Sequence, residues 1–217
     1  MKKIIAIALS FLFISLQSVK AEIGIGVTAA AHMFDASGTE TTRTSGEVNT
    51  GSHSETVVIP ELFIEAITDS GAVIGLSYIP TRDLGAKSRS DTNSDGDTGT
   101  YTAKAEFDNV MQLYTDIPVS EVSGYPIHVK LGIQHATLKS LESLNSGSEY
   151  PDEDLFGYTL GLGTKGDLPY GNNMYYKAEA TYTDFQDFSQ TSDSTPGNVV
   201  SAELEDVAVK FSIGYKF

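Results

Sequence analysis

The last twelve residues of the chain decide its fold class. Asp206 to Phe217 read DVAVKFSIGYKF, and the positions between the polar or small residues are all apolar: Val207, Val209, Phe211, Ile213, Tyr215 and Phe217. Successive side chains of a β-strand point to opposite faces, so an alternation of period two predicts a strand with one apolar face.

The same alternation recurs in seven further segments, at residues 22–34, 58–66, 74–78, 101–113, 125–134, 156–163 and 174–183. The connections are short at 69–71, 116–124 and 165–173, and longer and polar at 35–55, 82–99, 139–155 and 187–200. Short turns at one end and long loops at the other are typical of membrane barrels. The pattern therefore predicts an all-β chain, an eight-stranded antiparallel up-and-down transmembrane β-barrel.

Alternation alone also fits a soluble, lipocalin-like barrel, but three features favour the membrane. The faces opposite the apolar ones carry Gly, Ala and Thr in segments 22–34 and 156–163, which suits a narrow interior better than a wet exterior. Pro60 and Pro80 lie ten residues either side of Ser70, at one membrane edge, where water can replace missing ladder bonds. Aromatic residues gather near both ends of the apolar faces, at Tyr78, Tyr101, Phe156, Tyr158 and Tyr182 and at Tyr125, Tyr176, Tyr215 and Phe217.

The N-terminus and the charge indicate export. Residues 1–21 combine Lys2 and Lys3 with an apolar run and a small-residue cleavage site, so we expect a signal peptide there and a barrel domain at 22–217. The net charge is −15, and without the three lysines of the expected signal peptide it becomes −18. That sign excludes nucleic-acid binding. The lack of Cys excludes a disulfide scaffold.

The whole expected mature chain resembles the small eight-stranded outer-membrane proteins of the OmpA/OmpX and opacity-protein type. The resemblance rests on the pattern and on the C-terminus, where Lys210, Tyr215 and Phe217 match a family ending that is read by the barrel-assembly machinery. Ser212 stands where the family ending has glycine, a small departure. The resemblance implies location in the cell outer membrane, with outer-membrane lipids and lipopolysaccharide as neighbours.

Charged residues on the inward faces predict a packed interior. An eight-stranded barrel has room for little besides its own side chains, and buried charges need partners. We expect an interior charge network of five acids and four bases that fills the lumen; a narrow charged permeation path is the alternative. The residues are Glu61, Glu65, Lys104, Glu106, Asp108, Lys130, Lys177, Glu179 and Lys210.

Candidate chemistry elsewhere is weak. The four histidines have no partners that the sequence can assemble into a hydrolase triad, so we expect no catalytic residue and no cofactor. Asp91, Asn93 and Asp95 match the first half of an EF-hand calcium loop, but Thr102 stands where the bidentate glutamate belongs. No metal site is predicted, although calcium binding by these three residues stays open.

The predicted function follows from the loops, which carry most of the surplus acid. We expect a structural or surface-interaction role, as adhesin or receptor, toward lipopolysaccharide, an external surface or a phage. A small porin-like channel is the alternative, and a lipid-modifying enzyme is the weakest candidate.

Overall fold

The computed structural model describes residues 21–42, 45–92, 98–143, 150–169, 171–193 and 197–217. The expected signal peptide therefore lies outside the described residues, except for its last position. Ten strands are present in this part: β1 (Ala21–Thr41), β2 (Val48–Thr68), β3 (Val73–Ile79), β4 (Arg82–Thr92), β5 (Thr98–Val122), β6 (Tyr125–Ser143), β7 (Glu153–Asp167), β8 (Met174–Phe185), β9 (Phe188–Thr191) and β10 (Val199–Lys216).

The sheet closes into a ring through eight of these strands. Antiparallel neighbours follow the order β1, β2, β3, β5, β6, β7, β8 and β10, and β10 pairs back onto β1 from Gly24↔Lys216 to Thr41↔Val199. β4 pairs with β5 and β9 pairs with β10, so each continues the wall beyond β3 and β8 respectively. The predicted fold class, an antiparallel eight-stranded barrel, is confirmed.

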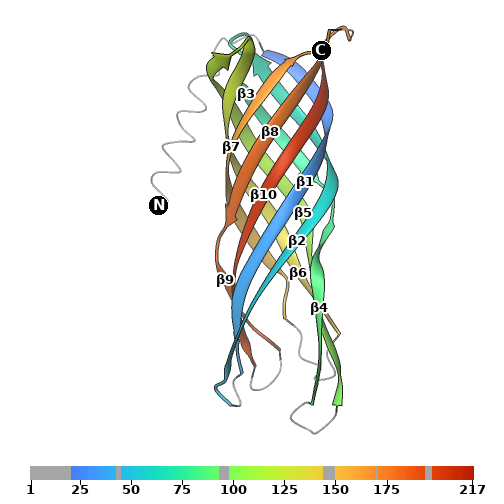
Figure 1. The fold of residues 1–217 in the computed structure, drawn as a ribbon, viewed down its shortest axis with the longest axis vertical. Coiled ribbons are helices and arrows are strands. Elements are labelled where there is room, and N and C mark those ends of the chain that lie inside the picture. Colours follow the sequence, from blue (N-terminus) through green and yellow to red (C-terminus); the bar gives the residue numbers. More distant parts are fainter. Residues whose placement is uncertain (1–20, 43–44, 93–97, 144–149, 170, 194–196) are drawn as a thin grey trace.

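The barrel is long, and its two ends differ (Figure 1). The C-terminus and the short connections lie at the upper end of the view, which we call the short-turn end. The other end, the extended end, carries the long hairpins. β1 has 21 residues, about twice what a tilted strand needs to cross a membrane. Half of the barrel wall therefore stands beyond the membrane.

The predicted long loops are thus largely strand. Segment 35–55, for example, continues the β1–β2 ladder up to Thr41↔Val48. The alternation of apolar and polar residues stops at the membrane edge. Beyond that edge the outward face of each strand meets water, so it does not have to be apolar. An alternation search therefore finds the membrane-level half of each strand and misses the rest.

Lipid-facing side chains form a wide apolar band on the outside of the membrane-level half. Large hydrophobic residues such as Val27, Leu62, Leu160, Val209 and Phe211 are about half exposed or more. An exposed apolar area of this size marks a membrane interaction. Among the described residues, no helix is long and apolar enough to cross a membrane.

Small residues on the inner face make room for aromatic rings from neighbouring strands. The Tyr114 ring lies against the backbone of Gly75, and the Tyr175 ring lies against Gly214, so a Cβ at either glycine would collide with the ring. These close approaches are the reason for glycine on the inward faces. The rings belong to a small hydrophobic cluster near the short-turn end, formed by Phe63, Ile67, Val73, Tyr114 and Tyr175.

A bulge in β5 reverses which face of that strand points inward. The β5–β6 register shifts between Asp108 and Met111, and Asn109 has a φ of 51°. Beyond the bulge Phe107 is fully buried inside, whereas Met111 on the near side faces lipid. The sequence pattern had placed both on one face, because a single inserted residue is invisible in a count of alternate positions.

Candidate functional site

The lumen of the membrane-level half contains two groups of paired charges. The first, the short-turn ionic group, surrounds Lys177, whose side chain is 2% exposed. Its Nζ donates to Glu65 Oε2 at 2.8 Å and lies 3.6 Å from Asp116 Oδ2. The hydroxyls of Tyr114 and Tyr175 also donate to the Glu65 carboxylate, at 2.7 and 2.8 Å. Glu65 thus accepts three hydrogen bonds from two other strands, β5 and β8.

Lys130 joins the remaining members of this group. Its Nζ lies 2.7 Å from Asp116 Oδ1 and 3.0 Å from Glu179 Oε1, over the face of the Tyr114 ring. His128 Nε2 is 3.0 Å from the same Glu179 oxygen. Each positive charge therefore neutralises acids from other strands, mostly across the lumen, as buried charges require.

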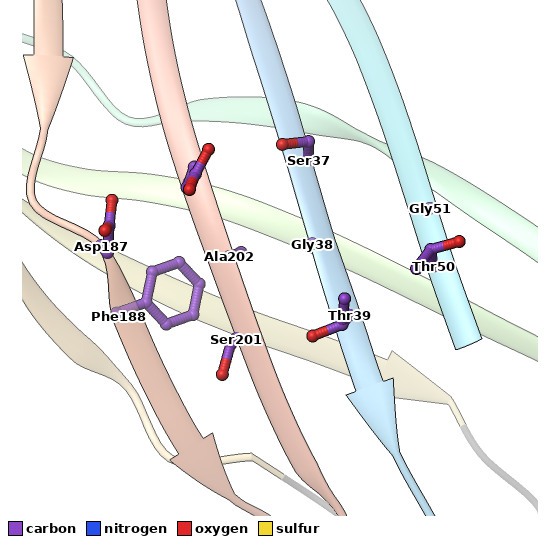
Figure 2. Close-up of a pocket in the computed structure, with 10 residues that line it drawn as sticks. Ser37, Gly38, Thr39, Thr50, Gly51, Asp187, Phe188, Ser201 and Ala202 are labelled. Atoms are coloured by element: carbon purple, nitrogen blue, oxygen red, sulfur yellow. The ribbon is translucent and has the colours of Figure 1, made fainter. Parts of the chain in front are cut away.

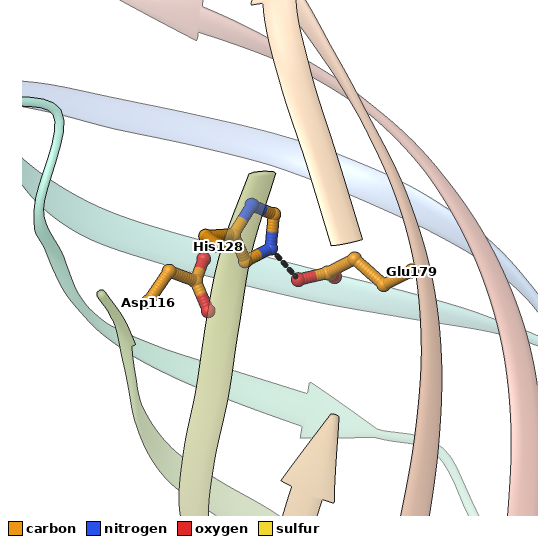
Figure 3. Close-up of side chains that lie close together, drawn as sticks. All are labelled: Asp116, His128 and Glu179. Carbon is orange, nitrogen blue, oxygen red and sulfur yellow. Dashed lines mark hydrogen bonds and ion pairs between the residues drawn. The ribbon is translucent and has the colours of Figure 1, made fainter. Parts of the chain in front are cut away.

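Asp116, His128 and Glu179 would also suit a metal ion, because their ligand atoms lie within 4.8 Å of one another (Figure 3). The ammonium of Lys130 already lies against both carboxylates. A divalent ion would have to displace that charge, and Lys177 stands beside it. The two carboxylates are therefore already neutralised by lysines, and this arrangement does not favour a metal ion.

The second group, the central ionic group, lies one level nearer the extended end. His32 Nδ1 is 2.8 Å from Asp206 Oδ2, and His32 Nε2 is 2.9 Å from Glu61 Oε1. Lys210 Nζ donates to the same Glu61 oxygen at 2.8 Å. All four side chains are at most 6% exposed. The void between the two ionic groups is about 10 Å³, roughly room for one water.

An apolar plug follows at the level where the membrane ends. The Arg82 guanidinium lies over the rings of Phe34 and Phe107, 4.6 and 5.2 Å from their centroids. Arg82 is 5% exposed, and its guanidinium has no hydrogen-bond partner among the described residues. The plug consists of Phe34, Ile59, Ile79, Leu84, Phe107, Val110, Ala136, Leu155, Phe185 and Leu204.

Six of the nine predicted network residues lie together in this lumen: Glu61, Glu65, Lys130, Lys177, Glu179 and Lys210. The prediction is wrong for the other three. The β5 bulge turns Lys104, Glu106 and Asp108 to the outer wall beyond the apolar band. Lys104 pairs there with Asp83 at 2.7 Å. The Lys139 ammonium and the Thr81 hydroxyl donate to Asp108, and these bonds lower the pKa of Asp108 to about 2.

Four charged lumen residues were missed. Asp116 and Arg82 fell in segments interpreted as a turn and a loop, although both are within strands. The sequence identifies no partner for His32, which lies against Asp206 and Glu61. Asp206 stands on the inward face of the C-terminal alternation, so the pattern itself could have found it.

The remaining candidates lie apart from the lumen network. Tyr215 and Phe217 face outward near the short-turn end with ring centroids 5.0 Å apart, whereas Lys210 is inside. Asn93 and Asp95 of the calcium candidate, with the side chain of Asp91, lie outside the described residues. A hollow of about 410 Å³ lies over β1, β2, β9 and β10, where the Phe188 ring lies beside Ala202 (Figure 2).

Comparisons with known proteins place this geometry among outer-membrane barrels. No family model and no curated relative match the chain. The outer-membrane protein AlkL, solved in DMPC bilayers, superposes with a TM-score of 0.59 at 11% identity, over 92% of this chain and 91% of that one. OprG of Pseudomonas aeruginosa gives 0.58 at 13%, over 93% and 98%. The outer-membrane protease OmpT of Escherichia coli gives 0.51 at 8%, over 93% and 99%. The fold is that of the small outer-membrane β-barrels.

Proposed function

We propose that this outer-membrane β-barrel acts at the cell surface, as a structural or surface-interaction protein with a sealed lumen. The observation that carries the proposal is the filled interior. Two ionic groups, an apolar plug and a void of about 10 Å³ leave no continuous path for a hydrated solute. Barrels that leave an aqueous channel have about 16–18 strands, so the small porin-like channel is the less supported alternative.

The extended end supports a role in contacts outside the cell. In membrane barrels the short turns face the periplasm and the long loops face outward. Just beyond the apolar band, Asp184, Glu205 and Asp35 are directly paired neighbours on three adjacent strands, and all three side chains are exposed. Like charges in adjacent positions cost stability unless something compensates them. Such a wall suits partners that bring positive charge, including cation-bridged lipopolysaccharide, an external surface or a phage protein.

The histidines support a non-enzymatic role. His32 and His128 are buried in the lumen, where His32 lies against Asp206 and Glu61 and His128 lies against Glu179. These carboxylates hold both imidazoles in place, and a hollow of about 200 Å³ at the short-turn end borders His128 but not His32. We therefore assign both to the structural network.

The two chain ends complete the proposal. We infer that residues 1–21 are removed on export and that Lys210, Tyr215 and Phe217 form the signal for the barrel-assembly machinery. Phe217 supports this inference because it is 70% exposed at the end of the ring-closing strand. Lys210 also binds Glu61, so it belongs both to the assembly signal and to the ionic network of the lumen.

Two measurements test the surface role. Refolded protein in planar bilayers should show no steady single-channel conductance, whereas a 16-stranded porin in the same bilayer should conduct. Regular conductance steps would favour the channel alternative. In cells, Asp35→Asn, Asp184→Asn and Glu205→Gln together should change binding to lipopolysaccharide or to an external surface. Unchanged binding at unchanged surface level would contradict the acidic wall as the contact site.

A further inference from the structure

The barrel wall has a seam between β2 and β4. The β2–β3 ladder ends at Leu62↔Tyr78, and in the same register Pro60 and Pro80 would face each other two positions farther on. Neither proline can donate a ladder bond. Within the described residues, β4 pairs with β5 and β2 pairs onward with β1, so no ladder joins β2 to β4. The seam begins at the outer edge of the apolar band and continues toward the extended end.

Side chains of β2 lie against β4 at this seam, His53 most closely and Glu55 beside it. β4 has a register shift between Asp83 and Ala86, and Gly85 at this point has a φ of +97°. His53 of β2 lies against Gly85 so closely that a Cβ there would collide with its Nε2 atom. His53 also lies 3.4 Å from Glu55. Side-chain contact, rather than backbone pairing, holds the two strands together here.

Behind the seam is a chamber of about 250 Å³ inside the extended half. Its floor is the apolar plug, with which it shares Leu84 and Leu204. Ala86, Ala105, Leu138 and other small or apolar residues form its walls. The chamber is therefore an apolar cavity outside the membrane, whereas the membrane-level lumen is ionic.

Three ionisable residues border the chamber: His53, Lys104 and Glu203. His53 is paired with Glu55, and Glu203 is an exposed residue of β10 next to the inward-facing Leu204. Lys104 is opposite the exposed Leu141 on the outer face of the wall and is bound to Asp83. A charged group that entered without a partner would lose its hydration and gain nothing in return.

We propose that the chamber binds a small uncharged apolar molecule that enters from outside through the seam. An apolar cavity of about 150 Å³ accommodates benzene, so 250 Å³ suits a molecule of roughly bicyclic size. The plug and the two ionic groups beneath make the chamber a dead end. The ligand binds and leaves on the outer side, which adds a small-molecule site to the proposed surface role.

Methyl NMR of the protein in lipid nanodiscs, titrated with naphthalene, tests this inference. The methyls of Leu84, Leu138 and Leu204 should shift and saturate. The methyls of Leu160, which faces lipid, should change only in proportion to the naphthalene dissolved in the bilayer. Parallel, unsaturated changes at all four leucines would show partitioning into lipid alone and would overturn the proposal.

Two variants and two further probes sharpen the test. Ala202→Phe, which fills the chamber, should abolish the saturable shifts, and Ala180→Phe on the lipid face should leave them intact. If Ala202→Phe does not fold, His53→Ala provides a second test, because opening the seam should speed ligand exchange without removing binding. Decanoate binding in preference to naphthalene would overturn the uncharged class. Passage of naphthalene to the interior of protein-containing vesicles, faster than through lipid alone, would overturn the dead end.

Discussion

The two halves of this barrel share one continuous wall, but one half is surrounded by lipid and the other by water. In the membrane-level half, apolar side chains face lipid and paired charges fill the interior. In the extended half the arrangement is reversed, with Phe107, Leu84 and Leu204 inside and Asp35, Asp184 and Glu205 outside. The polarity of the side chains inside this barrel therefore follows from the solvent outside it. Arg82 lies at the level where the surroundings change from lipid to water.

Removing a charge from the membrane-level half should have the largest effect. Lys177→Met would leave Glu65 and Asp116 buried without their nearest shared cation. Loss of one partner of a buried pair costs about 3–5 kcal/mol, less where water enters. Urea unfolding in lipid vesicles should show the loss in the midpoint. Lys139→Met, which removes a partly exposed pair with Asp108, is the control and should lower the midpoint much less. Equal midpoints for the two variants would contradict the ionic interior as a source of stability.

The extended half should respond to lost packing instead of lost charge. Phe107 is fully buried in the plug and contacts the rings of Phe34 and Phe185. Phe107→Ala should lower the free energy of unfolding by about 3 kcal/mol, at the lower end for such truncations because the chamber above lets neighbours relax. Phe211→Ala, on the lipid face, gives the comparison in the same unfolding assay. A smaller loss for Phe107 than for Phe211 would mean that the plug is not a core.

The C-terminal aromatic residue should matter for assembly more than for stability. Phe217→Ala should lower the amount of protein in the outer membrane, while the refolded barrel keeps nearly its parent unfolding midpoint, since Phe217 is 70% exposed. Phe211→Ala in the same strand controls for the loss of a lipid-facing ring. Equal outer-membrane levels for Phe217→Ala and the parent would remove the assembly role.

The smallest effect concerns the outer wall and pH. Because Lys139 and Thr81 lower the pKa of Asp108 from 3.8 to about 2, the carboxylate contributes stability above pH 3.8. That contribution is lost as the pH falls through about 2. The contribution of Asp108 to stability should therefore stay constant between pH 8 and 4. Carbon-detected NMR of the Asp108 carboxyl should give a midpoint near 2, and Lys139→Met should raise it toward 3.8. A midpoint near 3.8 in the parent protein would show that the pair does not persist in solution.

The sequence predicts the membrane-level half well and the extended half poorly, for a physical reason. Lipid imposes strict alternation, so the eight strands and the inward positions of Glu61, Lys177 and Lys210 follow from counting. Water imposes no such rule, and the strand extensions look like loops. The β5 bulge at Asn109 then misplaces Lys104, Glu106 and Asp108. The seam and the chamber depend on where ladders end, which requires the register that only the structure provides.

The ring-closing ladder between β1 and β10 also constrains how the chain can be made. It joins the first strand to the last, from Gly24↔Lys216 onward, so the contact with the greatest sequence separation can form only after synthesis is finished. Until then β1 and β8 are open edges that can pair with other chains. Loop-closure entropy makes such contacts slow to form. A chain truncated before residue 199 would be an unclosed sheet, and its expected fate is aggregation or proteolysis instead of a smaller barrel.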